Sequence, residues 1–415
     1  MIDVKQLQKI RDDFPQLDGP DYHYLDAAAT SLTPQSVLDA VIDYYTHYRA
    51  NVHRGLFDEA VMATKKYEAV RAKVAKFLNA KDEKEIIFNS GATESSNVVV
   101  RMFEESFKWE EEEKNIVTTE MEHHASLIPI QELAQRVGLN LEHIPLYLPA
   151  QAGSFGLDYD VAEELINEKT VIVSVMLASN VLGTVNDVRR IAKKAHQHGA
   201  VMIVDATAAA GHIPIDVEAL DCDVLYFSGH KMMAPTGVGV LWVRQQLLEK
   251  LNPAAFGGHM ISDVGAKKST WAPIPERFEA GTKNIAGVIG LGAAIDYLEG
   301  LGISRIHEHV RELTAYAIAR LEELPGLRVF AEHDVSKNIG IVSFVADWAH
   351  AHDIAEILSR DRVAVRAGHH CTIPLHGALK VQATTRASFH IYNSKEDVDA
   401  LVEGLKKARI VLVNS

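Results

Sequence analysis

Apolar residues recur along the chain at two spacings, one helical and one strand-like. Spacings of three and four residues predict helices at 36–48, 57–78 and 187–198, the last of which stops at Gly199. Short apolar runs alternate with these helices and predict strands, at residues 85–88, 170–177, 201–206, 224–228 and 238–243. Because these runs are apolar throughout, we expect strands buried on both faces, in a parallel or mixed sheet covered by helices.

The pattern changes after about residue 295. It predicts a compact α+β region, with helices at 303–324, 351–360 and 394–408 and short strands near 327–331 and 339–345. A chain of 415 residues that is 47% apolar can bury one large core and a smaller one. We therefore expect an α/β protein with a large domain at 20–295 and a small domain formed by 1–19 and 296–415. The acidic run 104–114 is interpreted as a solvated helix end.

Charge and cysteine content exclude several classes of function. The formal net charge of −14 repels phosphate backbones, and no apolar stretch approaches the roughly 20 residues that span a bilayer. We therefore expect neither nucleic acid nor a membrane as a partner. Two cysteines cannot form a disulfide framework, and the N-terminus has no apolar run with a basic flank, so we expect a cytoplasmic protein.

Polar residues follow four of the strand-like runs, at the points where the runs stop. Ligands of open α/β sheets bind beyond the carboxyl ends of the strands, which makes these residues candidates. Ala92 and Thr93 open a helix whose N–H groups favour an anion, although small residues are also common at helix starts. Asp205 needs a cationic partner if it is charged, and a helix-capping role explains it equally well. Asn180 stands at another strand end.

Lys231 directly follows a fourth apolar run, preceded by Ser228 and His230. Burial among apolar residues lowers the pKa of a lysine, which makes its amine available as a nucleophile. Asp205 lies 26 positions before it. An amine, an anion and phosphate donors are the groups that pyridoxal phosphate needs. The residues therefore suit a phosphate-bearing aldehyde cofactor held as a Schiff base.

Motifs along nearly the whole chain resemble class V, fold-type I pyridoxal-phosphate enzymes, specifically the group II cysteine desulfurases of the SufS type. They are YLDAAAT (24–30), YRANVHRG (48–55), GATESSN (91–97), EHHAS (122–126), SNVLGT (179–184), SGHK (228–231), RFEAGTKN (277–284), RAGHHC (366–371) and RASFHIYN (386–393). The resemblance implies a mainly parallel seven-stranded sheet, pyridoxal 5′-phosphate as cofactor, and conversion of L-cysteine to L-alanine with transfer of its sulfur.

The same resemblance assigns roles to residues of this chain. Lys231 would form the Schiff base, Asp205 would pair with the ring nitrogen, and His123 would stack on the ring and shuttle protons. The phosphate would be held by Ala92, Thr93, Ser228 and His230, and by Thr282 from a second subunit, which implies a homodimer. The substrate carboxylate would be gripped by Asn180 and Arg386, with Arg366 and His53 lining the same pocket.

Cys371 could be a metal ligand, an inert thiol or a nucleophile. Consecutive residues such as His369, His370 and Cys371 rarely converge on one tetrahedral metal, and they make a poor apolar pocket. Neighbouring positive groups favour the thiolate. We therefore predict that Cys371 takes the substrate sulfur as a persulfide, and that Cys222 is structural.

The resemblance also implies a sulfur-acceptor protein of the SufU or SufE kind and a role in iron–sulfur cluster assembly. His352 stands where relatives that use SufU have a histidine. Four residues depart from the family pattern: Ala208 replaces a glutamine, Ser90 an arginine, Lys283 a proline and His259 a glutamate. Two alternatives remain open, namely a selenocysteine lyase or other class V lyase or transaminase, and a non-catalytic cofactor-binding partner protein.

Overall fold

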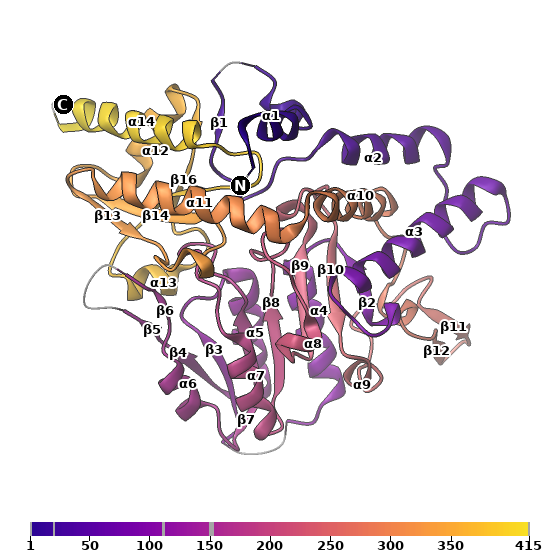
Figure 1. Cartoon of the computed structure of the whole chain (residues 1–415). Coiled ribbons are helices and arrows are strands. Elements are labelled where there is room, and N and C mark those ends of the chain that lie inside the picture. The colour runs from indigo at the N-terminus through magenta and orange to yellow at the C-terminus, as the bar shows by residue number, and fades with distance from the viewer. Residues whose placement is uncertain (1, 20, 110–112, 149–152, 414–415) are drawn as a thin grey trace.

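The computed structural model describes residues 2–19, 21–109, 113–148 and 153–413, and its largest sheet has seven strands (Figure 1). Their order across the sheet is β2 (Ile86–Asn89), β10 (Gly239–Val243), β9 (Val224–Ser228), β8 (Val201–Asp205), β7 (Thr170–Met176), β3 (Asn115–Thr119) and β4 (Asn140–Ile144). Strand β10 runs antiparallel to both of its neighbours, and the other paired strands are parallel. The predicted α/β class and the mainly parallel seven-stranded sheet are confirmed.

Successive residues of the central strands point to opposite faces of this sheet. In β2, Phe88 joins the core on one face and Ile87 joins the core on the other. One face is covered by α4 (Ala92–Ser106) and α5 (His124–Val137), and the other by helices that include α3 (Asp58–Phe77), α7 (Val188–Gln197) and α10 (Ile285–Leu301). Burial on both faces explains why the strand runs are apolar throughout.

A second sheet has four antiparallel strands and lies beside the carboxyl ends of the large one (Figure 1). Its order is β13 (Leu327–Phe330), β14 (Ile341–Ala346), β17 (Thr384–Ser388) and β16 (Arg366–Gly368). It is accompanied by α11 (Ile303–Glu322), α12 (Ala351–Arg360), α13 (Ile373–Ala378) and α14 (Lys395–Val413). The N-terminal helix α1 (Val4–Asp12) is tied to α14, because Arg11 pairs with the buried Asp397 at 3.3 Å.

The remaining helices and strands are short, apart from helix α2. They are β1 (His23–Tyr24), α2 (Gln35–His47), β5 (Leu146–Tyr147), β6 (Gly156–Leu157), α6 (Tyr159–Leu165), α8 (Val217–Leu220), α9 (Gln245–Leu248), β11 (Ile261–Val264), β12 (Ser269–Trp271) and β15 (Val363–Ala364). Helices α2 and α3 reach away from both sheets at the right of the view in Figure 1.

Most predicted elements lie within two residues of the observed ones, and three differences stand out. The last helix continues to Val413, five residues past its predicted end. The acidic run 104–114 is helical only up to Ser106, where α4 ends; residues 110–112 lie outside the described part of the chain. Helix α10 was not predicted, because it is apolar on all sides along most of its length, up to Asp296, and therefore shows little helical periodicity.

Among the described residues, no single helix is long and apolar enough to cross a membrane. Helices α10 and α11 reach the required length and hydropathy only when taken together, and this pair is bent by 72°.

Three buried histidines lie near the junction of the two sheets, and we predict that they make the fold sensitive to acid. The rings of His212 and His390 are 4.4 Å apart, and His309 Nε2 lies 2.8 Å from the carbonyl oxygen of Asn393. Burial, with a smaller effect of His307, lowers the pKa of His212 to about 4. Burial also holds the pKa of His390 well below its usual range.

An unfolded histidine takes up its proton near pH 6.5, before the buried ones do. The contribution of these residues to stability is therefore fully present above about pH 6.5 and falls as the pH drops toward 4. For His212 alone we expect a loss of about 2 kcal/mol between about pH 7 and pH 5. Urea unfolding at both pH values should show a smaller loss in His212→Gln than in the wild type, whereas the exposed His47→Gln should behave as the wild type. Equal losses in all three proteins would refute the assignment.

Candidate active site

A cleft of about 190 Å³ opens where the carboxyl ends of the central strands face the smaller sheet. Strand β7 leads into it through Asn180, β8 through Asp205, and β9 through Lys231. The smaller sheet contributes Arg366 and Arg386. All predicted site residues line this cleft except His53 and Thr282; the others are Ala92, Thr93, His123, Ser228, His230 and Cys371.

Lys231 and Asp205 form the electrostatic centre of the cleft. Burial, followed by the charge of Arg386, lowers the pKa of Lys231 to about 8, although Asp205 acts in the opposite direction. Burial raises the pKa of Asp205, while Lys231 and the backbone N–H of Thr207, which donates to Oδ1 at 2.9 Å, favour its charged form. The arrangement provides an amine that is partly uncharged near neutral pH, close to a buried carboxylate.

His123 is the N-cap residue of α5 and lines the cleft. Its Nδ1 accepts a hydrogen bond from the backbone N–H of Ala125 at 3.0 Å, so the ring proton of the neutral form is on Nε2. Burial and the nearby Lys231 lower the pKa of His123 to about 3. The ring is therefore neutral at physiological pH and presents one donor.

The N-terminus of α4 forms a small cradle at one side of the cleft. Its N-cap residue, Gly91, has φ of 148° and gives the helix no side-chain cap. The N–H of Ala92 donates to Ser228 Oγ at 2.8 Å, and a Cβ added at Gly91 would lie 3.1 Å from the same oxygen. Helix N–H groups and hydroxyls gathered in this way favour a bound anion such as phosphate.

Two arginines and one asparagine from different parts of the chain lie at the opposite side. Arg386 is 2% exposed; its Nη1 donates to the carbonyl oxygen of Asn180 at 2.8 Å, and its Nη2 pairs with Asp26 Oδ1 at 3.0 Å. Among the described residues, neither Arg386 Nε nor Asn180 Oδ1 has a partner. Arg366 on β16 lies opposite Arg386 on β17 in the backbone register of the smaller sheet. These groups can bind a carboxylate.

Cys371 is exposed and lines the cleft, on a loop with unusual backbone geometry. His370 has φ of 49° and Cys371 has φ of 58°, a region that costs about 1–3 kcal/mol for each residue that is not glycine. Burial, with the charge of Arg386, lowers the pKa of His370 to about 2, so this imidazole adds no positive charge beside the thiol. The charge of a Cys371 thiolate raises the pKa of Lys231, which shows that the two groups interact.

Metal ligation was one alternative for the GHHC segment. Over the described ranges, no three or more His, Cys, Asp or Glu side chains are grouped so that they could hold a metal ion. His370 instead directs Nε2 at Thr384, with Oγ1 at 3.0 Å.

His53 and Thr282 line a second cleft, together with Asn51, Val52, Arg54, Tyr67, Gly258, His259, Glu279, Gly281 and Lys283. Its predicted role in the substrate pocket stays a prediction, because within a single chain His53 lies apart from the cleft that Arg366 lines. The reason is that His53 is held against α3, where its N–H donates to Thr64 Oγ1 at 2.8 Å and its Nε2 lies 2.7 Å from Glu68 Oε1.

The residues that depart from the family pattern are distributed over both clefts. Ala208 is buried in the lining of the Lys231 cleft and provides no hydrogen-bond donor there from its side chain. His259 stacks on His53 in the second cleft, with ring centroids 4.7 Å apart. Lys283 also lines the second cleft, and the N–H of Ser90 donates to Glu94 at 2.6 Å.

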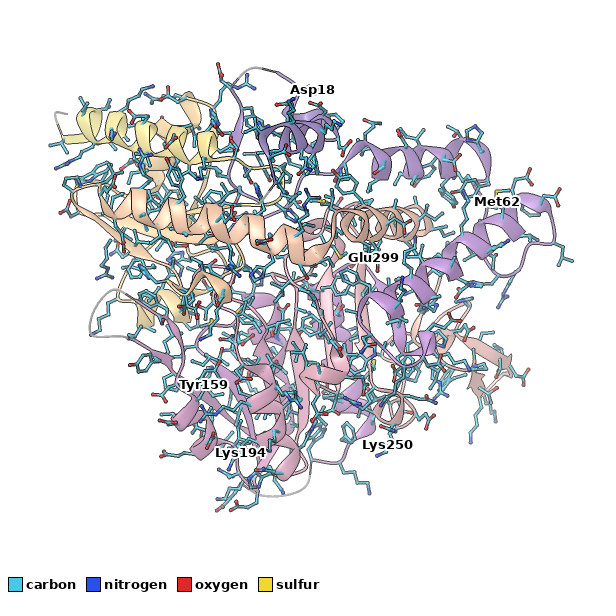
Figure 2. All side chains as sticks on the ribbon, viewed as in Figure 1. Asp18, Met62, Tyr159, Lys194, Lys250 and Glu299 are labelled. Carbon is cyan, nitrogen blue, oxygen red and sulfur yellow. The ribbon has the colours of Figure 1, made fainter. Side chains whose placement is uncertain are left out.

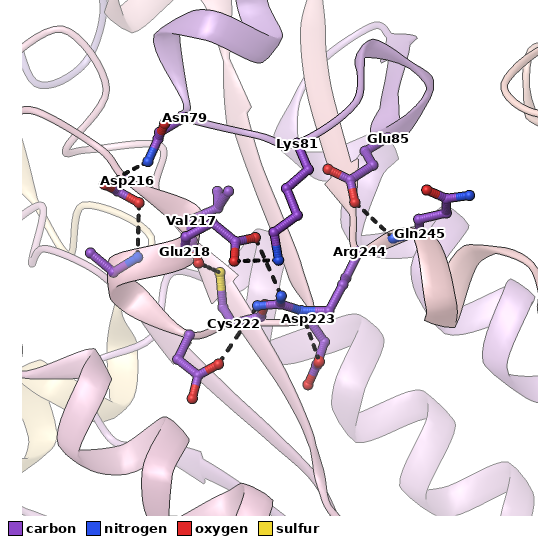
Figure 3. Close-up of polar contacts among 12 residues, drawn as sticks. Asn79, Lys81, Glu85, Asp216, Val217, Glu218, Cys222, Asp223, Arg244 and Gln245 are labelled. Carbon is purple, nitrogen blue, oxygen red and sulfur yellow. Dashed lines mark hydrogen bonds and ion pairs between the residues drawn. The ribbon is translucent and has the colours of Figure 1, made fainter.

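Cys222 lies away from the cleft and is enclosed by a polar network (Figure 3). Its carbonyl oxygen accepts a hydrogen bond from Arg244 Nη2 at 2.8 Å, and Arg244 also pairs with Glu218 at 3.3 Å. Burial raises the pKa of the Cys222 thiol well above its usual value. The thiol is therefore unreactive at neutral pH.

Sequence reasoning missed two residues that hold parts of the site in place. Asp26 pairs with Arg386, and His124 contacts the loop that carries Cys371. Both belong to motifs that were recognised, YLDAAAT and EHHAS, but their partners lie more than 240 positions away. No local pattern indicates contacts across such a separation.

Comparisons with known proteins agree over the full length of the chain. Residues 23–401 match the family model described as aminotransferase class-V. A protein of Halalkalibacterium halodurans named probable cysteine desulfurase is 46% identical over 98% of this chain and 97% of its own length. The probable cysteine desulfurase of Streptomyces coelicolor is 45% identical over 97% of each chain.

Two solved structures are similar to this fold. One is the apo structure of the cysteine desulfurase from Thermococcus onnurineus, with a TM-score of 0.91 and 39% identity over 98% of both chains. The other is the cysteine desulfurase CsdA (S-sulfonic acid) from Escherichia coli, with a TM-score of 0.89 and 38% identity over 99% of this chain and all of that chain.

Proposed function

We propose a mechanism for this chain from the premise that it belongs to the aminotransferase class-V family and is a cysteine desulfurase. It takes sulfur from L-cysteine, releases L-alanine and supplies the sulfur for iron–sulfur cluster assembly. The observation that carries the mechanism is the meeting of Lys231, Asp205 and Cys371 in one cleft, although they lie on three different segments of the chain. Within the family we assign it to the group II, SufS type.

We propose pyridoxal 5′-phosphate as the cofactor, because the groups that line the cleft fit it. Lys231 provides the amine for its aldehyde, Asp205 the anion for its ring nitrogen, and His123 a neutral ring to stack on it. The cradle of α4 provides phosphate donors from Ala92, Thr93, Ser228 and His230. Asn180 Oδ1 and Arg386 Nε, which have no partner among the described residues, are further polar groups free to bind a ligand in the cleft. When bound, the cofactor withdraws electrons from the substrate Cα.

Lys231 is the proton carrier in this mechanism. With a pKa of about 8, lowered from its usual value, its amine is more often unprotonated near neutral pH than that of an exposed lysine, and it can remove the proton from the substrate Cα. Asn180 and Arg386 hold the substrate carboxylate, with Arg366 at the exposed side, and so direct the Cα–H bond toward the amine. His123 offers its Nε2 proton within the same cleft.

Cys371 carries out the sulfur transfer. Its thiolate forms a bond to the substrate sulfur while the bond from that sulfur to Cβ breaks. Cβ then takes up a proton and the amine of Lys231 returns a proton to Cα, which gives alanine. The product on the enzyme is a persulfide at Cys371. Because Cys371 is exposed, the persulfide is accessible to an acceptor protein.

We propose a homodimer in which Thr282 and His53 reach the active site of the second copy. Exposed apolar side chains gather on α2, α3 and the loop between them; they are Leu38, Ile42, Tyr45, Leu56, Phe57, Val61 and Met62 (Met62 is labelled in Figure 2). Leu56 is 97% exposed, and several large apolar side chains left exposed on neighbouring segments of the chain favour a protein interface. Helix α3 also lines the second cleft through Tyr67, beside His53 and Thr282.

The sulfur acceptor is proposed to be a protein of the SufU or SufE kind. His352 is exposed at the start of α12, and its ring stacks on His350 with centroids 5.1 Å apart. This position makes it available to a partner protein. We place the enzyme in the cytoplasm, since a reactive free thiol suits a reducing compartment.

Absorbance of the cofactor tests the proposal directly. Added to the purified chain, pyridoxal 5′-phosphate should produce the visible band of a lysine-bound aldehyde, and L-cysteine should then yield alanine and sulfide. Lys231→Ala should lose the band, because no other amine is placed at the end of β9. Lys250→Ala, at an exposed lysine far from the cleft (Figure 2), should keep it.

Two outcomes would contradict the proposal. A wild-type chain that shows no band with added cofactor would favour a non-catalytic role. A band without alanine formation from L-cysteine, but with turnover of L-selenocysteine or another amino acid, would favour a different class V lyase or a transaminase.

A further inference from the structure

His124 makes two hydrogen bonds to the loop that carries Cys371, one at Cys371 and one at Ile373. Its backbone N–H donates to the carbonyl oxygen of Cys371 at 2.8 Å, and its side-chain Nε2 accepts from the N–H of Ile373 at 3.1 Å. His124 is the first residue of α5, a helix of 14 residues packed on the large sheet. The loop is thereby fixed to a rigid element at Cys371 and at the second residue after it.

The loop needs such support because two consecutive residues, His370 and Cys371, have positive φ. Residues in this region keep their conformation only when the surroundings hold them. Asn180 Nδ2 donates to the carbonyl oxygen of His370 at 2.9 Å, and the N–H of Thr372 donates to that of His369 at 2.9 Å. These contacts hold the start of the loop, whereas His124 holds Cys371 itself and the residues that follow.

The accepting role of Nε2 requires a neutral imidazole with its proton on Nδ1. Burial, with the charge of His369, lowers the pKa of His124 and so favours this neutral form. Glutamine has a carbonyl oxygen that can replace Nε2 as acceptor, and leucine has no acceptor at a similar size. The pair of substitutions therefore separates the hydrogen bond from the volume of the side chain.

We propose that His124 is a positioning residue that holds Cys371 where its thiolate meets the substrate sulfur. This inference rests on the proposed function, in which Cys371 is the sulfur acceptor. His124 itself touches neither the substrate nor the cofactor in this mechanism. Its contribution is the geometry of the sulfur transfer.

The test compares His124→Leu, His124→Gln and the wild type as cofactor-loaded enzymes. For His124→Leu we expect kcat for alanine formation to fall about 10- to 100-fold, since a displacement of about 1 Å costs a reaction roughly that much. KM for L-cysteine and the visible cofactor band should stay unchanged, because the groups that hold them are elsewhere. His124→Gln should restore most of kcat. His143→Leu, at a similarly half-buried histidine on the edge strand β4, serves as the control.

Alkylation of Cys371 by iodoacetamide, followed by mass spectrometry, gives a readout independent of turnover. The thiol should react in His124→Leu at least as fast as in the wild type, because the loop is released rather than covered. Unchanged kcat in His124→Leu, or a His124→Gln variant as impaired as His124→Leu, would overturn the inference. So would alkylation that slows in parallel with turnover, since that result would indicate an altered thiol rather than an altered position.

Two further arms keep the test decisive. If His124→Leu does not fold, His124→Asn replaces it, since its oxygen is one methylene short of the Gln position and should restore little. If wild-type enzyme forms no persulfide on Cys371, the proposed function fails, whatever the His124 variants do. A wild type that forms the persulfide, with His124 variants that do not affect it, refutes the positioning role alone.

Discussion

Replacing Cys371 with alanine is expected to lower the formation of alanine and sulfide from L-cysteine by at least about 10³-fold, the scale for loss of a nucleophile. The visible cofactor band should remain, because Lys231, Asp205 and the cradle of α4 are unchanged. The reason is that the substrate sulfur then has no thiolate to accept it. The measurement is product release under saturating L-cysteine, together with mass spectrometry of the protein for a persulfide.

Cys222→Ala is the matched control for this substitution. Its thiol is buried and its pKa is raised, so it should leave kcat unchanged. Alanine formation that persists in Cys371→Ala would show that sulfur leaves the substrate without this residue. The enzyme would then belong to the lyases that release the heteroatom directly.

The behaviour of the cleft depends on coupling between its charges. Arg386 lowers the pKa of Lys231, whereas Asp205 and a thiolate at Cys371 raise it. The proton affinity of the amine therefore depends on whether the thiol is ionised.

Part of this site was predictable from the sequence, because the strands that carry it are adjacent. In the parallel register Met176 pairs with Asp205, and Asp205 pairs with Tyr226, so the segments that follow β7, β8 and β9 leave the sheet side by side. Polar residues after three apolar runs thus had to meet. The position of Cys371 was not predictable in this way, because it comes from a loop beside a different sheet; motif resemblance supplied it.

Other features depend on contacts that no local pattern encodes. The position of His53 in the second cleft of its own chain follows from contacts with Thr64 and Glu68 on α3, which the sequence pattern does not indicate. The pairing of Asp26 with Arg386 joins the segment that follows β1 to β17, the last strand. The domain boundaries at residues 20 and 295 stay predictions. Amphipathic helices were recognised by their periodicity, whereas the evenly apolar α10 was not.

Replacing Glu279 with alanine is expected to lower the free energy of unfolding by about 3–5 kcal/mol, since it removes the fully buried one of the two carboxylates that pair with the buried Arg71. Glu279 is 1% exposed and binds Arg71 through both oxygens, Nη1 to Oε1 at 2.8 Å and Nη2 to Oε2 at 3.1 Å. It also accepts from the N–H of Phe88 at 2.7 Å, which ties it to strand β2. Urea unfolding followed by circular dichroism measures the loss.

Asp296→Ala provides the control. Asp296 pairs at 2.5 Å with Lys73, and Lys73 lies on the same helix as Arg71, two residues further along. Asp296 is 63% exposed, and such surface pairs contribute at most about 1 kcal/mol. Equal effects of the two substitutions would refute the role of the buried pair. A large effect of Glu279→Ala alone would also bear on the proposed dimer. Arg71 binds both Glu279 and Glu68, and Glu68 contacts His53. Because Glu279 lies three residues before Thr282, this one network supports both residues that are proposed to enter the second subunit.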